Sequence, residues 1–180
     1  MNITRRIAIR NLMLVTAGTL LLPSCLEGSA SIKLINIDID AGKEGILAAL
    51  TDAIIPKTDT PGAKDISAHL FALKMVDDCY TKDEQKAFMQ GFEEFNRMVE
   101  NKYNSSFSKL QAPQQEELLS QLEKGNDVPE AIKSFYSSTK RLTILGYTTS
   151  KYFLSEVKHF SLLPGKYQGA VPVNSSKASV

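Results

Sequence analysis

Residues 81–99 read TKDEQKAFMQGFEEFNRMV, and this stretch decides the fold. Its large apolar side chains recur at steps of four, three and four residues: Phe88, Phe92, Phe95 and Val99. This spacing places them on one face of an α-helix. Thr81 and Glu84 have the spacing of a capping box, which predicts where the helix begins. Such a stripe forms either core or a partner groove, and core is the commoner use, so we expect core.

Helical patterns continue on both sides of this stretch. Asp40 is a suitable N-cap, Pro56 stops one helix, and Gly125 and Gly146 are expected to close two others. Between the first two helices, Pro61 and Gly62 suit the centre of a type II turn. The other expected helices cover residues 41–55, 65–80, 113–124, 129–146 and about 150–158. These patterns predict a compact all-α domain of five to six helices.

The composition is that of one soluble domain. The chain has 180 residues, two cysteines and a formal charge of +1. The first 24 residues hold three arginines and no acid, so their removal would change the charge to about −2. A near-neutral domain offers no basic face for nucleic acid.

The N-terminus resembles a bacterial export signal. A basic segment precedes an apolar stretch from Leu12 to Leu22, which is shorter than the roughly 20 residues of a membrane-spanning helix. Leu22-Pro23-Ser24-Cys25 then resembles a lipobox, in which Cys25 receives a lipid and the chain is cut after Ser24. Arg5 and Arg6 also suit a twin-arginine signal, although the general secretory route remains open.

These features divide the chain into four parts. We expect a signal peptide at 1–24, a lipidated tether at 25–40, a helical domain at 41–169 and a flexible tail at 170–180. The tether is either a short strand or, as we prefer, an extended arm laid on the domain. With Cys25 lipidated, Cys79 is left as a free thiol, which we expect to be half-buried. A Cys25–Cys79 disulfide is the alternative.

Few residues suggest catalysis. His69 and His159 have no second ligand at metal-binding spacing, and we expect both to be structural or surface residues. Haem-attachment, iron–sulfur and nucleotide-binding motifs are missing from the sequence. Asp77-Asp78 and Glu93-Glu94 are paired acids whose neighbours on a helix point in different directions, so they are expected to face solvent.

Three sequence blocks, together with the leader, carry a resemblance to a known family. Residues 51–63 read TDAIIPKTDTPGA, residues 146–150 read GYTTS, and residues 163–169 read LPGKYQG. This set resembles the gluconate 2-dehydrogenase subunit 3 family over about residues 40–172. The block at 51–63 is the most specific of them.

The resemblance implies a partner. In that family a small exported helical subunit associates with a large flavin-dependent dehydrogenase of the glucose–methanol–choline type, and a cytochrome c subunit often completes the complex. FAD is then expected in the large subunit and haem in the cytochrome, with none in this chain. The small subunit supplies the export signal for a folded partner, and its lipid would hold the complex on the periplasmic side of the envelope. The family name is not evidence of the substrate.

We expect the partner to contact two loops, one with Pro61 and Gly62 and the other with Pro164, Gly165 and Tyr167. Rigid loops lose little entropy on docking, and the same residues could equally serve only as turns.

Two other functions stay open: a free-standing lipoprotein that binds a small ligand or the cell wall, and a small enzyme. An exposed apolar patch would favour the subunit. A closed apolar cavity would favour the ligand-binding lipoprotein, and a buried His159 paired with a carboxylate would favour the enzyme.

Overall fold

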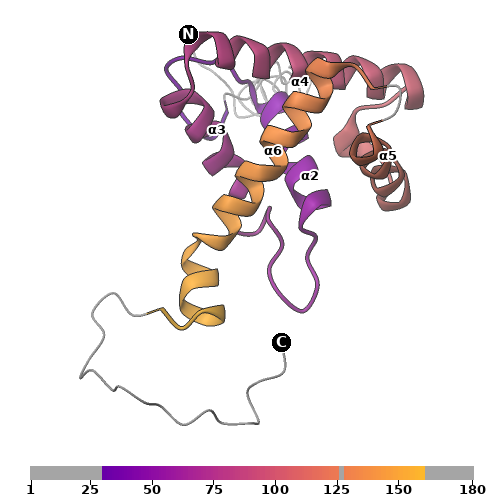
Figure 1. The fold of residues 1–180 in the computed structure, drawn as a ribbon. Helices are drawn as coiled ribbons and strands as arrows, with labels where there is room; N and C mark the ends of the chain where they lie inside the picture. The colour runs from indigo at the N-terminus through magenta and orange to yellow at the C-terminus, as the bar shows by residue number, and fades with distance from the viewer. Residues whose placement is uncertain (1–29, 126–127, 161–180) are drawn as a thin grey trace, which may run out of the picture.

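The structure is a computed structural model that describes residues 30–125 and 128–160. This part of the chain is helical and contains no strand, which confirms the all-α prediction. Figure 1 shows the long helix α4 lying across one end of the molecule, with α6 running away from it past α2 and α3. The helices are α2 (Ala41–Ile54), α3 (Ala68–Cys79), α4 (Lys82–Tyr103), α5 (Ala112–Lys124) and α6 (Glu130–Thr148). A 3-10 turn, η1 (Phe107–Lys109), and a π-helical turn, η2 (Phe153–Val157), complete the list.

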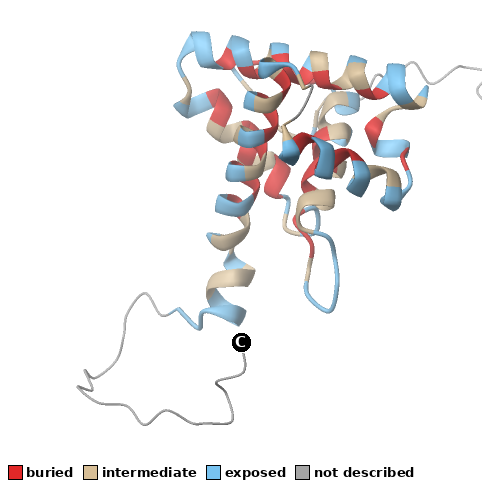
Figure 2. Cartoon of the chain, turned by 45° about the vertical axis from the view of Figure 1, so that its right-hand side comes forward, coloured by how far each residue is buried: buried red, intermediate tan, exposed pale blue. Residues whose placement is uncertain are grey.

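The aromatic stripe of α4 forms the core, as predicted. Phe88, Phe92 and Phe95 pack around Phe135 of α6, with ring centroids 5.1, 5.4 and 5.6 Å from its own. Buried residues gather where α2, α3, α4 and α6 face one another (Figure 2). The two long helices approach closely at Gly91, where a Cβ atom would lie 2.4 Å from the Ala131 carbonyl oxygen. Glycine is therefore part of the packing between α4 and α6.

Several helix ends follow the sequence signals. The Asp40 side chain caps α2 by accepting the Lys43 N–H, and Thr81 and Glu84 form the predicted capping box of α4. Gly125 ends α5 in the left-handed conformation, with φ of +66°. Each cap satisfies backbone groups that a helix terminus leaves without partners.

Other boundaries differ from the prediction. The second helix begins at Ala68 and not at Asp65, because Ser67 adopts a left-handed φ of +58° that interrupts the turns before it. Gly146 does not end α6, which continues to Thr148. A Cβ at Gly146 would lie 2.7 Å from Cδ1 of Phe71, so this glycine permits close packing of α3 and not a helix end.

The connection at 104–112 also contributes to the core. Most of its residues are polar, but Phe107 in η1 is fully buried and packs against Phe95, with the ring centroids 5.5 Å apart. The η1 turn packs on α2 and α4. One aromatic side chain thus fastens the link between α4 and α5.

The N-terminal arm, residues 30–39, is neither helix nor strand and contains several bends, and it packs on the helices. Ile37 and Ile39 join the core, whereas the side chain of Ile35 is 81% exposed. The arm approaches the end of α3 and the start of α4, where the Asn36 side chain bonds the Asp77 carbonyl and Lys82.

Asp77 holds the arm. The backbone N–H groups of Ile35, Asn36 and Ile37 all donate to its carboxylate, at 2.6–3.2 Å. Asp77 is only 1% exposed, so the prediction that it faces solvent was wrong, while Asp78 does face solvent. Burial raises the pKa of the Asp77 carboxyl, but the three N–H donors and Lys74 together hold that pKa below its usual value. This arrangement, which we call the Asp77 latch, keeps the carboxylate charged.

Candidate functional site

Two of the residues predicted to contact a partner, Pro61 and Gly62, lie in the loop after α2. Pro61 is half-buried and Gly62 is buried, whereas residues 56–60 at the tip of the loop are exposed. The other predicted site residues lie outside the described residues: Arg5, Arg6, Ser24, Cys25, Pro164, Gly165 and Tyr167. Their roles stay predictions.

The loop is fixed from inside the molecule. Tyr147 of α6 donates its hydroxyl to the Pro61 carbonyl oxygen at 2.8 Å, and the Gly62 N–H donates to the Asp65 carboxylate at 3.1 Å. Gly62 does not have a positive φ, so the predicted type II turn is wrong. Glycine is required there because a Cβ would lie 2.7 Å from the Lys57 backbone nitrogen. The conformation of the loop is therefore fixed by contacts within the molecule, and its tip is exposed.

The bond from Tyr147 joins two of the blocks that carried the family resemblance. Residues 51–63 and 146–150 are far apart in sequence and meet here. The Tyr147 ring also packs edge-on against Phe153 of η2, with centroids 6.0 Å apart. Tyr147 thus braces the loop, the end of α6 and η2 together.

Residues 144–160, which we call the terminal projection, expose large apolar side chains. The exposed fractions are 44% for Ile144, 38% for Leu145, 48% for Val157 and 60% for Phe160. No residue of η2 is buried, and Figure 1 shows this segment extending away from the helical body. Leu145 is exposed although it lies only three residues after the buried Leu142.

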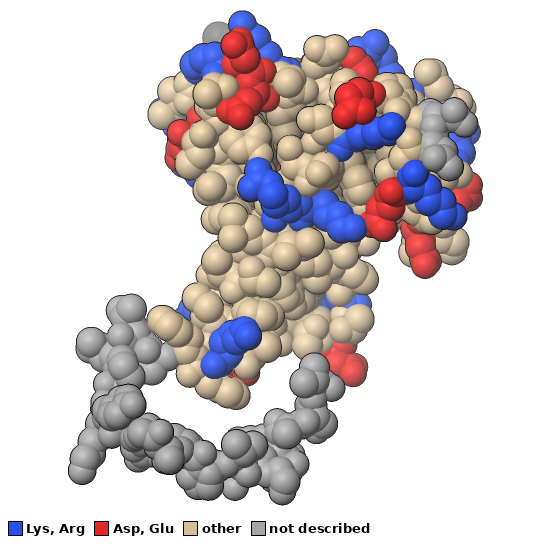
Figure 3. All heavy atoms as spheres, viewed as in Figure 1, with Lys and Arg blue, Asp and Glu red and all other residues tan. Residues whose placement is uncertain are grey.

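The terminal projection is also poor in charge. It contains only Lys151, Glu156 and Lys158 as charged residues. Figure 3 shows charged side chains spread over the helical body, whereas the narrower part below the body carries few of them. Uncharged surface of this kind loses little solvation when another protein covers it.

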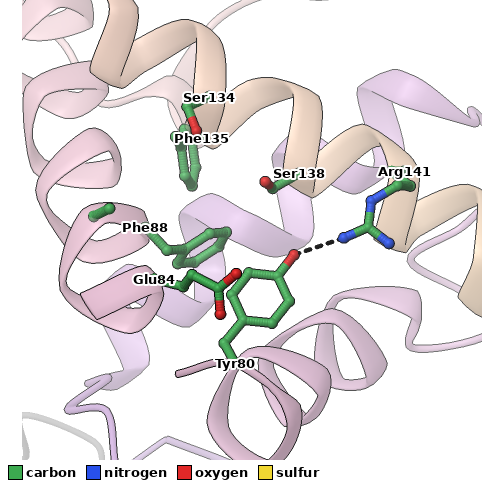
Figure 4. Close-up of a pocket in the computed structure, with 8 residues that line it drawn as sticks. Tyr80, Glu84, Phe88, Ser134, Phe135, Ser138 and Arg141 are labelled. Carbon is green, nitrogen blue, oxygen red and sulfur yellow. Dashed lines mark hydrogen bonds between the residues drawn. The ribbon is translucent and has the colours of Figure 1, made fainter. Parts of the chain in front are cut away.

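A separate cavity of about 270 Å³ lies between α4 and α6 (Figure 4). Phe88 and Phe135 form its floor. Arg141 donates to the Tyr80 hydroxyl at 2.8 Å at its edge, and Glu84 and Ser138 line its walls. Within the described ranges, Arg141 has no carboxylate partner. The cavity is half-open and its rim is polar, so it is not the closed apolar cavity typical of a buried ligand.

The histidines do not form a catalytic pair. His159 is exposed, so the condition set for an enzyme is not met. His69 is buried, and its Nε2 lies 3.9 Å from the Glu44 carboxylate. Burial lowers the pKa of His69; Glu44 opposes this shift and Lys64 adds to it. His69 is thus a buried residue beside a carboxylate, and His159 is a surface residue.

No cluster of three His, Cys, Asp or Glu side chains that could hold a metal occurs among residues 30–125 and 128–160. Over the same residues, no helix is long and apolar enough to span a bilayer. Cys79 is exposed, and not half-buried as expected, and it forms no disulfide within the described residues; Cys25 lies outside them.

The fold and these surfaces define a class: a small helical domain with exposed apolar side chains at one end. Residues 41–165 match the family model described as gluconate 2-dehydrogenase subunit 3, and the chain belongs to this family. A search of curated proteins and a search of solved structures found no match. The family is one of subunits of a dehydrogenase complex, in agreement with the resemblance seen in the sequence.

Proposed function

We propose that this protein is the non-catalytic small subunit of a periplasmic FAD-dependent sugar or alcohol dehydrogenase, and that it supports export, assembly and membrane anchoring of the catalytic subunit. The observation that carries the proposal is the pairing of the family match with the exposed apolar projection. Large exposed apolar surfaces on soluble domains usually mark interaction sites.

The N-terminal sequence supports the export and anchoring parts of the proposal. Arg5 and Arg6 suit a route that carries folded proteins, which a partner already loaded with flavin requires. Cys25 would hold the complex on the membrane, because a mature lipoprotein carries enough acyl chains for stable attachment. A cytochrome c is the expected third component.

The proposal places FAD in the partner. The family match supports this assignment, because the family is one of subunits of a dehydrogenase complex. In such a complex the large subunit would supply the flavin chemistry, and this chain would act by binding and positioning that subunit.

A pull-down tests this function. The tagged protein is purified from detergent-solubilised envelope, and the absorbance spectrum of the eluate is recorded. We expect a flavin spectrum and a co-purifying protein of several hundred residues. Changing Arg5 and Arg6 to lysine should remove both proteins from the envelope. A colourless eluate without a partner would contradict the proposal.

The polar cavity favours a second candidate, a free-standing lipoprotein that binds a small ligand. Arg141 and Glu84 offer one positive and one negative group near an aromatic floor. If the pull-down is colourless, the cavity is tested by comparing the Arg141→Ala variant with the parent protein. Stabilisation of the parent alone by periplasmic extract would support the second function.

A further inference from the structure

We propose that the terminal projection is the surface on which the catalytic subunit docks, and that the partner's face is an apolar depression with an acidic rim. This inference rests on the proposed function. It moves the main contact away from the buried Gly62 and onto the exposed side chains Ile144, Leu145, Val157 and Phe160.

The first support is the concentration of apolar surface. Five large hydrophobic side chains are exposed in the described part of the chain, and four of them lie within residues 144–160. The fifth, Ile35, lies on the arm near the Asp77 latch, and Figure 1 shows the arm well away from the projection. Surface hydrophobes that occur singly need no explanation, whereas four within residues 144–160 concentrate apolar surface on one segment.

Charge indicates what kind of face would fit. The apolar side chains are accompanied by Lys151 and Lys158 and by one acid, Glu156. A complementary partner would bury the apolar groups and place carboxylates opposite the two lysines at the edge. Charges at the rim direct association while the apolar centre supplies most of the affinity.

The position of these exposed residues within the chain gives a further argument. Phe160, the last described residue, belongs to the patch, and twenty residues follow it. The family match continues through the patch to residue 165. The patch is therefore part of the family domain, in a family of dehydrogenase subunits, and this favours the catalytic subunit over other occupants.

The surface is also held in shape. Tyr147 bonds the Pro61 carbonyl oxygen and packs on Phe153, and the Thr149 hydroxyl bonds the Leu145 carbonyl oxygen at 2.7 Å. A surface ordered before binding loses less entropy when the partner docks. The exposed tip of the loop, residues 56–60, extends the same end of the molecule.

The test uses the full-length protein co-expressed with its dehydrogenase. A Val157→Glu, Phe160→Glu double variant places two carboxylates in the patch, and Ile35→Glu is the matched control at the other end. Because an unpaired charge is costly to bury, the amount of flavin recovered per small subunit should be at least about tenfold lower for the double variant than for the wild type. The control should recover as much as the wild type. Circular dichroism melting checks that both variants are folded.

The outcomes separate this inference from the proposed function. If the wild type recovers no flavoprotein, the proposed function fails. If the wild type and the double variant recover equal flavin, or if Ile35→Glu loses as much, the docking surface is wrong. Sedimentation of the isolated protein tests a second copy as the occupant, and truncation after Phe160 tests the chain's own C-terminal segment. The inference would be overturned if the isolated protein forms dimers that the double variant abolishes. It would also be overturned if the partner binds only after the chain is truncated.

Discussion

Asp77 shows how one side chain can join two distant segments. Its carboxylate accepts three consecutive backbone N–H groups from an arm about 40 residues earlier in the chain. The Ile37 N–H belongs to a buried residue, and a buried N–H group without a partner is costly. The arm therefore depends on a charged carboxylate at this position.

We expect Asp77→Asn to destabilise the protein by about 1–3 kcal/mol, because hydrogen bonds to a charged acceptor are lost in a buried site. Urea unfolding measures the change, and limited proteolysis should show faster cleavage within residues 30–39. Asp78→Asn is the matched control and should change the stability by less than about 0.5 kcal/mol. Equal effects from the two variants would mean that the latch does not hold the arm.

His69 should make stability depend on pH. Its pKa in the folded protein lies below the ordinary value of 6.5. Between these two values the unfolded chain binds the proton more readily, so acidification destabilises the folded state. The effect is absent well above pH 6.5 and develops as the pH falls through 6.5 toward the folded pKa.

Urea midpoints measured from pH 8 to pH 5 test this expectation. The wild type should lose stability over the acidic part of the range, and His69→Gln should show a flatter slope, whatever its stability at pH 8. The depressed carboxyl pKa of Asp77 contributes only at lower pH, because its stabilisation is lost as the pH falls below about 3.8. Identical slopes for the two proteins would exclude His69 as the source.

At the scale of the residue, sequence reasoning succeeded with caps and failed with Asp77. Asp40, Thr81 and Gly125 act on their own helix, so their roles follow from local spacing. Asp77 acts on a distant segment, and a pair of adjacent acids usually faces water. Only the folded arrangement reveals the arm above it.

At the scale of the element, glycine allows the helices to approach each other. Gly91 lies where α4 crosses α6, against the backbone of Ala131. Gly45 lies in the middle of α2, and a Cβ there would meet nothing within 4 Å. The two positions have the same residue and the same helical conformation but opposite surroundings.

Alanine at these two positions should have opposite effects. Gly91→Ala should destabilise the protein by about 1–3 kcal/mol or more, because the rigid backbone of α6 must move. Gly45→Ala should stabilise it by about 0.5–1 kcal/mol, because alanine is the better helix former. Thermal unfolding of both variants measures this. A stabilising Gly91→Ala would show that the helices are not held this closely.

The helices themselves were predictable because their apolar stripes are local. The misplaced features all depend on contacts between elements. Phe107 stands alone among polar residues, and Gly146 looks like a helix end but makes room for Phe71. In neither case could the nearby sequence show which distant surface the residue meets.

At the scale of the whole molecule, the position of the exposed apolar side chains could not be predicted from the sequence. Leu145 follows helical spacing from the buried Leu142, so the pattern suggests core. The next residue, Gly146, is buried against Phe71 of α3, so α3 covers one side of α6 here and Leu145 lies on an uncovered side. Which side of a helix its neighbours cover is not visible in the local pattern.

The arm and the terminal projection give the molecule two distinct ends. If lipid at Cys25 anchors the arm, Cys79 beside the latch should lie nearer the bilayer than Val157. The exposed Cys79 thiol should react fully with a fluorescent maleimide in the native protein. On vesicles with a headgroup quencher, that label should be quenched more than one at Val157→Cys in a Cys79→Ser background. The reverse order would contradict this orientation.

The Asp77 latch also has a mechanical consequence. The Glu44 carboxylate also binds Ser31, and with the arm fastened there the covalent chain from Cys25 to Ser31 can reach at most about 20 Å. Released as far as Asp40, the chain could reach about 50 Å. If Cys25 carries the lipid anchor, the fastened and released arm would allow two different distances between the helical domain and the membrane, and Asp77 would contribute to the choice between them.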